Sequence, residues 1–140
     1  MEPLRFSDNE LFEGWGEPMR SESTIDGLEI IQGAIPEGLE GTLYRNGADW
    51  QYPSDRADDI FIDGEGMYHM FRFEDGQVSY RSRWVHTARY ELQHKAKRQL
   101  FGRYRNRYTS QPEARQTHMG TANTTAMFHA GHLYALKEDD

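Results

Sequence analysis

The dipeptide Asp75-Gly76 is the feature that most restricts the fold, because it stands between two runs of alternating apolar and polar residues. Asp-Gly is favoured in two-residue hairpin loops, where both loop residues adopt positive φ. A loop of this length also determines the register, which places Phe73 opposite Val78. We therefore predict an antiparallel hairpin over residues 61–85 with one mostly apolar face.

A second hairpin is predicted over residues 121–138, with Ala130-Gly131 as its loop. This register places Phe128 opposite Leu133. Two hairpins of similar size are typical of propeller blades separated from their ring, so the chain is expected to be all-β apart from one helix.

The one predicted helix lies between the hairpins, over residues 88–102. Thr87 is suited to cap its N-terminus, and Gly102 is suited to end it. Apolar residues recur every four positions in this stretch, which is typical of one buried helix face.

The first part of the chain has weaker signals. Residues 1–34 are polar with scattered glycine and proline, and are predicted to form an irregular arm. A short strand is predicted over residues 42–45, followed by a turn at Asn46-Gly47.

Composition excludes several classes of protein. Hydrophobic residues make up only 36% of the 140 residues, so the chain is either a loop-rich small domain or a piece of something larger. A net charge of -7 argues against a general nucleic-acid binder, and the absence of cysteine excludes disulfides and cysteine-based zinc sites. No apolar run approaches the roughly 18 residues of a membrane span, and the N-terminus lacks a signal-peptide pattern. We therefore expect a cytoplasmic protein with no nucleic-acid partner and no membrane span.

Histidines and carboxylates are the first candidates for chemistry. His129 and His132 flank the second turn, but a metal site normally needs three or four ligands. We expect His69 and His129 to form hydrogen bonds on packed hairpin faces instead. Asp63 and Glu65 are separated by a glycine, and a turn that starts a strand explains them better than a calcium loop or a glycosidase pair.

Basic residues are the second group of candidates. Basic side chains interleaved with Tyr104 and Tyr108 could contact single-stranded nucleic acid, but a solvated helix face followed by a surface loop is the simpler interpretation. These basic residues are Arg89, Lys95, Lys97, Arg98, Arg103, Arg105 and Arg107. Lys137 ends an apolar strand, and lysines are rarely buried unless paired or used. The residues alone also allow Lys137 to extend into water.

Three collinear stretches together resemble the carotenoid cleavage oxygenase superfamily. They are IPEGLEGTLYRNG (35–47), FIDGEGMYHMFRFEDGQVSYRSRWVHTARY (61–90) and GTANTTAMFHAGHLYALKE (120–138). The resemblance implies a seven-bladed β-propeller that carries a non-haem iron(II) on its axis, held by four histidines. It also implies insertion of both atoms of O2 across a carbon–carbon double bond.

The same resemblance implies an incomplete propeller. Residues 1–34 would be an N-terminal arm, and residues 35–140 the first blades, with the helix and loop of 88–120 inserted. The remainder of the propeller would be missing. In this superfamily the first iron histidine lies beyond the position of Glu138, so we expect no metal ligand in this chain and Fe(II) bound by histidines downstream of residue 140.

Two departures point to the lignostilbene dioxygenase branch. Carotenoid-cleaving members usually read Arg-Asn-Gly-Pro where this chain has Arg45-Asn46-Gly47-Ala48, and often have tryptophan in the last motif, which here reads Ala-Leu-Lys-Glu through Lys137. RQLFG followed by RYRNRYT (98–109) also looks like that branch, whose members cleave the central double bond of 4-hydroxystilbenes.

The resemblance implies roles for individual residues. A lysine at the position of Lys137 and a tyrosine at the position of Tyr104 hold the phenolic oxygen of the substrate. An ammonium and a hydroxyl donor favour the ionised phenol, which pushes electron density onto the alkene. Glu138 corresponds to a carboxylate that hydrogen-bonds an iron-ligating histidine. Phe61, or else Ile62, corresponds to a side chain that lines the stilbene cleft.

These expectations combine into one hypothesis and two alternatives. The chain is predicted to be the N-terminal portion of an iron(II) dioxygenase that cleaves 4-hydroxystilbenes with O2 to two aromatic aldehydes, inactive alone because it lacks the iron ligands. The alternatives are a carotenoid or apocarotenoid cleavage oxygenase and a stand-alone β-rich binding module. The sequence leaves open whether the full-length enzyme forms a homodimer.

Overall fold

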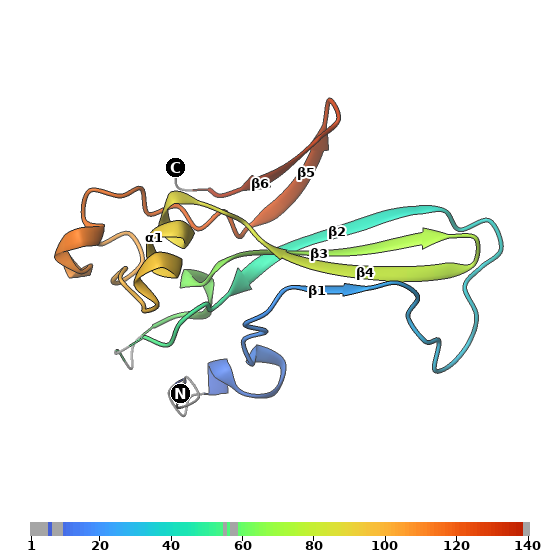
Figure 1. The fold of residues 1–140 in the computed structure, drawn as a ribbon, viewed down its shortest axis with the longest axis horizontal. Coiled ribbons are helices and arrows are strands. Elements are labelled where there is room, and N and C mark those ends of the chain that lie inside the picture. The colour runs from blue at the N-terminus through green and yellow to red at the C-terminus, as the bar shows by residue number, and fades with distance from the viewer. Residues whose placement is uncertain (1–5, 7–9, 55, 57–58, 139–140) are drawn as a thin grey trace.

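The computed structural model describes residues 6, 10–54, 56 and 59–138, and consists mainly of antiparallel β-structure (Figure 1). Four strands form one sheet in the order β1-β4-β3-β2, and two more form a separate hairpin. The strands are β1 (Ser23–Ile25), β2 (Gly41–Asp49), β3 (Glu65–Glu74), β4 (Gln77–Trp84), β5 (Thr125–His129) and β6 (His132–Leu136). The helices are α1 (Ala88–Ala96) and the short 3₁₀ segments η1 (Glu10–Phe12), η2 (Gly14–Gly16), η3 (Phe61–Asp63), η4 (Arg107–Thr109) and η5 (Pro112–Ala114). The prediction of a mostly β chain with one α-helix is confirmed for the described residues.

The β3–β4 hairpin forms as predicted. Asp75 and Gly76 make its loop with φ values of 50° and 70°, and Phe73 pairs with Val78. The register prediction is confirmed because a two-residue loop leaves no freedom to shift the strands.

The β5–β6 hairpin also has the predicted loop and register, with Phe128 opposite Leu133. It projects away from the four-stranded sheet (Figure 1), so its apolar side chains, including Phe128, are largely exposed. The expectation that His129 lies on a packed face is wrong, because His129 is exposed at the tip of this projecting hairpin.

The predicted turn at Asn46-Gly47 is wrong. Both residues lie inside β2, where Asn46 pairs with Tyr68 and Gly47 pairs with Met67 of β3. Pairing along β3 outweighs the local turn preference, because strand preference depends on neighbouring strands more than on the residue itself. The arm predicted to be irregular also contributes β1, which pairs with β4.

Helix α1 begins where predicted but ends earlier. The Thr87 hydroxyl accepts a hydrogen bond from the Tyr90 amide at 3.0 Å, which confirms the N-cap. The helix ends at Ala96 rather than at Gly102, and its C-cap residue Lys97 adopts φ 56°. Gly102 has a different role, since a Cβ there would lie 2.1 Å from Oγ1 of Thr109.

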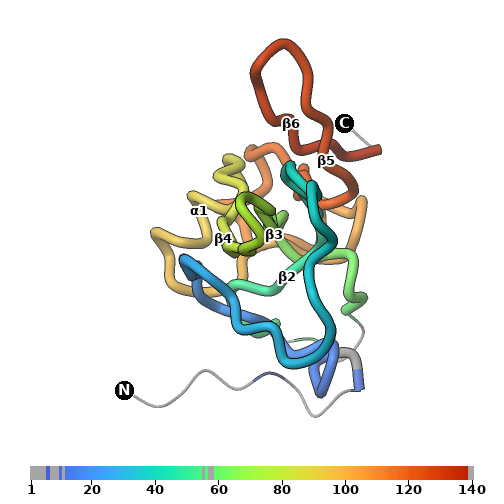
Figure 2. The backbone as a smooth tube through the Cα atoms, turned by 90° about the vertical axis from the view of Figure 1, so that its right-hand side faces the viewer, coloured from blue at the N-terminus to red at the C-terminus, as the bar shows by residue number. Residues whose placement is uncertain are grey.

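The segment before β5 crosses the start of β3. The Gly66 amide donates a hydrogen bond to the Thr121 carbonyl oxygen at 2.8 Å, and a Cβ on Gly66 would lie 2.3 Å from the Ala122 carbonyl oxygen. In Figure 2, β5–β6 stands at the top of the molecule, and the N-terminal part of the chain, in blue, lies below the four-stranded sheet. The crossing also brings residues that lie more than 50 positions apart in sequence into one site.

The crossing predicts a difference between two glycines. Gly66→Ala should lower the free energy of unfolding by about 1–3 kcal/mol, because the new methyl group must displace a backbone carbonyl. Gly47→Ala is the matched control, since Gly47 lies in β2 with no heavy atom within 4 Å of its Cβ position. Urea unfolding of both variants checks this, and equal stabilities would contradict the tight crossing.

Candidate functional site

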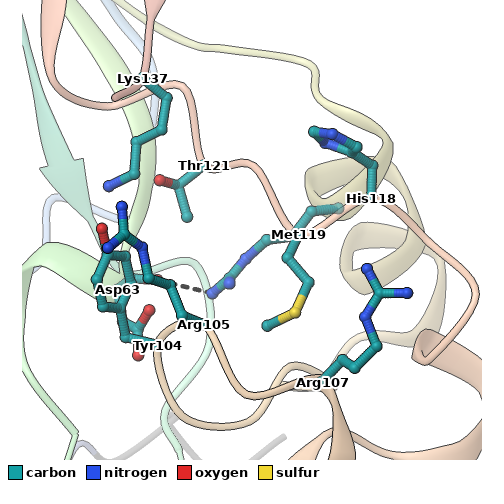
Figure 3. A pocket seen from close by; sticks show the side chains of 9 residues that line it. Asp63, Tyr104, Arg105, Arg107, His118, Met119, Thr121 and Lys137 are labelled. Carbon is teal, nitrogen blue, oxygen red and sulfur yellow. Dashed lines mark hydrogen bonds between the residues drawn. The ribbon is translucent and has the colours of Figure 1, made fainter. Parts of the chain in front are cut away.

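A cavity of about 300 Å³ lies between the start of β3, the loop after α1 and the end of β6 (Figure 3). Its lining is mostly charged or polar. The lining residues are Asp63, Arg89, Tyr104, Arg105, Arg107, His118, Met119, Thr121 and Lys137. Basic side chains outnumber acidic ones in this lining, although the whole chain carries a net charge of -7.

Lys137 follows β6 directly and is partly buried. Its Nζ donates a hydrogen bond to Oδ1 of Asn123 at 3.1 Å and lies 5.1 Å from the centroid of the Tyr104 ring. An ammonium at this distance from an aromatic ring is attracted by the ring's quadrupole. Of the two interpretations that the sequence left open, the structure therefore selects a paired lysine that faces a cavity.

Tyr104 contacts a second cation. The guanidinium carbon of Arg105 lies 5.2 Å from the same ring centroid, and Figure 3 shows the Lys137 side chain extending toward Tyr104 and Arg105. Two positive charges thus gather around one phenol side chain. Such a cluster would stabilise an anion bound nearby.

Asp63 ties the Tyr104 loop to the start of β3. Its carboxylate accepts a hydrogen bond from the Tyr104 backbone amide, and its carbonyl oxygen accepts one from Nη2 of Arg89 at 2.7 Å. Burial raises the pKa of the Asp63 carboxyl, and the charge of Arg89 opposes this shift. Asp63 is the one acidic residue in the lining, and it lies beside the guanidinium of Arg89.

A buried network supports this wall of the cavity. Nε of Arg89 and Nε2 of Gln93 both donate to Oε1 of Glu65, each at 2.6 Å. Burial raises the pKa of the Glu65 carboxyl, while the charge and hydrogen bond of Arg89 oppose the rise. Oε1 of Gln93 accepts the Leu100 amide at 3.0 Å, which links the network to the chain that leaves α1.

The expectation of a fully solvated basic helix face is wrong for Arg89. Its side chain is only 2% exposed, because it pairs with the buried carboxylate of Glu65. Glu65 lies 24 positions earlier in the chain. Local sequence contains no signal for this pairing. The position of Glu65 at the start of a strand agrees with the prediction for that carboxylate.

Sequence reasoning also missed Asn123. This residue is 6% exposed, and its Nδ2 donates to the carbonyl oxygens of Ile62 at 2.8 Å and Gly64 at 2.7 Å. Asn123 therefore connects Lys137 with the turn that ends η3. Its only sequence signal is its place in the stretch that resembles the oxygenase superfamily.

Comparison with known proteins identifies the family. The family described as retinal pigment epithelial membrane protein matches residues 16–140. The chain belongs to this family, the carotenoid cleavage oxygenases. The resemblance drawn from the sequence is thereby confirmed.

The similar proteins within this family include enzymes named for the cleavage of lignostilbene and resveratrol. Lignostilbene-alpha,beta-dioxygenase isozyme III of Sphingomonas paucimobilis is 42% identical over 134 residues, which are 96% of this chain and 27% of that protein. Resveratrol cleavage oxygenase 1 of Chaetomium globosum is 39% identical over 98% of this chain and 23% of that protein. The crystal structure of Pseudomonas brassicacearum lignostilbene dioxygenase matches with a TM-score of 0.90 at 40% identity, covering 98% of this chain and 28% of that one. The chain spans about a quarter of the length of these relatives.

The cavity does not gather every residue that the resemblance implied. It unites Tyr104 and Lys137, which are 33 positions apart. Phe61 instead lines a separate groove near Trp15 and Phe71, whereas Ile62 lines neither cavity. Glu138 is exposed and is not part of the Lys137 cavity lining. The expected roles of all five residues stay predictions.

Among the residues with described positions, no three His, Cys, Asp or Glu side chains lie together as a metal site would require. His69 packs as predicted, with Nδ1 2.8 Å from the Tyr80 hydroxyl. Within the same part of the chain, no helix has both the length and the apolar character needed to cross a membrane.

The buried network predicts a large effect of charge removal. Arg89→Met should cost about 3–5 kcal/mol of unfolding free energy, because it leaves the Glu65 carboxylate buried without its counter-charge. The double variant Glu65→Leu/Arg89→Met should be more stable than Arg89→Met alone. Arg98→Met is the control, since Arg98 pairs with Glu113 at the surface, where an ion pair contributes about 0–1 kcal/mol. Equal unfolding free energies for the Arg89 and Arg98 variants would contradict this.

Proposed function

We propose that the chain forms the phenol-binding part of a non-haem iron(II) dioxygenase that cleaves the central double bond of 4-hydroxystilbenes. The products would be two aromatic aldehydes, each receiving one oxygen atom of O2. The observation that carries the proposal is the convergence of the Lys137 ammonium and the Tyr104 ring in one cavity, 5.1 Å apart.

The charge of the cavity explains why a phenol suits it. A free phenol has a pKa of about 10, so it is mostly neutral near pH 7. The Lys137 ammonium, with Arg105 nearby, would lower that pKa, and each pKa unit corresponds to about 1.4 kcal/mol in favour of the phenolate. Tyr104 would donate its hydroxyl to the same oxygen. The phenolate then delocalises negative charge through the ring onto the alkene, which becomes more reactive toward an electrophilic oxidant.

We also propose, from the family resemblance, that histidines outside this chain hold the iron. Iron supplies the activation of O2 in this scheme, and the residues of this chain bind and ionise the substrate. We assign Glu138 to hydrogen-bond one of the iron histidines and Phe61 or Ile62 to line the stilbene cleft. These assignments rest on the family resemblance.

Two kinds of relative support the phenolic substrate class. Lignostilbene and resveratrol, which appear in the names of the relatives, are phenols that carry a conjugated alkene. The alternative is a carotenoid or apocarotenoid, which the wider family name suggests. A carotenoid hydrocarbon offers no acidic oxygen, so a partly buried ammonium beside its path would have a desolvation cost without a compensating partner.

Substitution of Lys137 tests the proposal. In the iron-loaded enzyme that contains this chain, Lys137→Met should lower kcat/KM for 4-hydroxystilbene by about 100-fold or more, because one stabilising charge is lost. Iron content, measured by metal analysis, should stay at the level of the unsubstituted enzyme. Unchanged turnover would refute the role of Lys137.

Two controls sharpen this test. Lys97→Met removes an equivalent charge from the exposed end of α1, and turnover should be retained. Comparing 4-hydroxystilbene with an apocarotenal as substrates separates the two functional alternatives. Faster turnover of the apocarotenal would favour the carotenoid alternative.

A further inference from the structure

The buried amide of Asn123 makes three hydrogen bonds, which join the backbone on either side of Asp63 to the Lys137 ammonium. Nδ2 donates to the Ile62 carbonyl oxygen at 2.8 Å and to the Gly64 carbonyl oxygen at 2.7 Å. Oδ1 accepts from Nζ of Lys137 at 3.1 Å. Asn123 is 6% exposed, so water cannot readily replace these partners.

The two carbonyl partners determine which way the amide faces. Only the NH₂ end of an asparagine can donate, and its two hydrogens match the two carbonyl oxygens of Ile62 and Gly64. A flipped amide would place Oδ1 against both carbonyls and turn a donor group toward the Lys137 ammonium. The oxygen of Asn123 is therefore held facing Lys137 by the backbone of the η3 turn.

A neutral acceptor has a specific consequence for Lys137. An ammonium has three N–H donors, and Asn123 accepts only one of them. The amide oxygen orients the ammonium without cancelling its positive charge. A carboxylate at the same position would form an ion pair with Lys137 and compete with a bound phenolate.

We propose that Asn123 is a positioning residue that holds the Lys137 ammonium against Tyr104 and thereby sets the preference of the cavity for a phenolate over a neutral aryl ether. The inference rests on the proposed phenol-binding function and adds a determinant of specificity to it. Asn123 acts through Lys137, and its contacts need not include the substrate.

Two substitutions of Asn123 should move the pKa of Lys137 in opposite directions. Asn123→Asp places a carboxylate beside the ammonium, which should raise the pKa of Lys137. Asn123→Leu removes the acceptor and leaves an apolar neighbour, which should lower that pKa. A residue that only stabilises the fold would not produce opposite shifts.

The pKa of Lys137 can be measured directly in the iron-loaded enzyme that contains this chain. Lysines are methylated reductively with ¹³C-formaldehyde, and their NMR signals are followed during a pH titration. The Lys137 signal is identified by its absence from Lys137→Arg. The other titratable groups that line the cavity are the same in every variant, and they are Asp63, Arg89, Tyr104, Arg105, Arg107 and His118. The comparison therefore isolates Asn123.

Ligand binding provides the second measurement. 4-Hydroxybibenzyl and 4-methoxybibenzyl lack the alkene, so both can be titrated without turnover. The Kd of the ether divided by the Kd of the phenol should fall about tenfold in both Asn123 variants, which is the effect of a free-energy change of about 1.4 kcal/mol. The phenol should lose affinity while the ether changes little.

Asn46→Asp is the matched control. The Asn46 amide also donates to two carbonyl oxygens, those of Ala122 at 2.8 Å and Thr125 at 3.1 Å, and supports the same segment of chain. No hydrogen bond joins Asn46 to Lys137 among the described residues. Asn46→Asp should leave the Lys137 pKa and the Kd ratio unchanged.

The outcomes separate this inference from the proposed function. If Lys137→Met abolishes turnover while neither Asn123 variant changes the Lys137 pKa or the Kd ratio, the positioning role is overturned and the phenol-binding function stands. If Asn46→Asp reproduces the shifts of Asn123→Asp, the effect is structural and the positioning role is also overturned. If Lys137→Met has no effect on turnover, the proposed function itself fails.

Discussion

The buried ion pair between Glu65 and Arg89 is the interaction on which the rest of the site depends. Both side chains are 2% exposed, and removing each charge from water costs several kcal/mol. The pair is tolerable because Gln93 donates a second hydrogen bond to Glu65 and the Asp63 carbonyl accepts a further one from Arg89. Replacing such a pair by apolar groups is often neutral, so its main effect is to specify geometry. Here it specifies where α1 and the loop that carries Tyr104 meet the start of β3.

Asn123 makes a second connection of the same kind. Where the ion pair joins α1 to β3, this amide joins the end of η3 to the end of β6. The close approach at Gly66 lets the segment that carries Asn123 cross β3 at backbone distance. Lys137 is therefore held by two contacts, with the Asn123 amide and with the Tyr104 ring. Its long side chain loses more conformational freedom than it would in solvent. Such preorganisation is what the proposed phenol-binding role of Lys137 requires.

The charge of the cavity is opposite to that of the chain. The net charge of -7 reflects carboxylates spread over the arm and loops, whereas Lys137, Arg105 and Arg107 converge on one cavity. Net charge therefore describes solubility and long-range association, and it does not describe a local site. Asp63 is the one acidic residue in the cavity lining, and Arg89 lies beside it. An anionic ligand is the natural complement of such a cavity.

Local chemistry in the sequence determined the β3–β4 hairpin and the start of α1. The loop at Asp75-Gly76 and the cap at Thr87 each depend on residues only a few positions apart. The same local rules failed at Gly47, where pairing with β3 replaced the expected turn. Family resemblance supplied Tyr104 and Lys137 as candidates, but only the tertiary structure brought them together and added Asn123 as their support. The salt bridge between Arg89 and Glu65 could not be predicted from the sequence either. Glu65 lies 24 positions from Arg89, and no local pattern encodes which distant charge a folded chain will bury beside it.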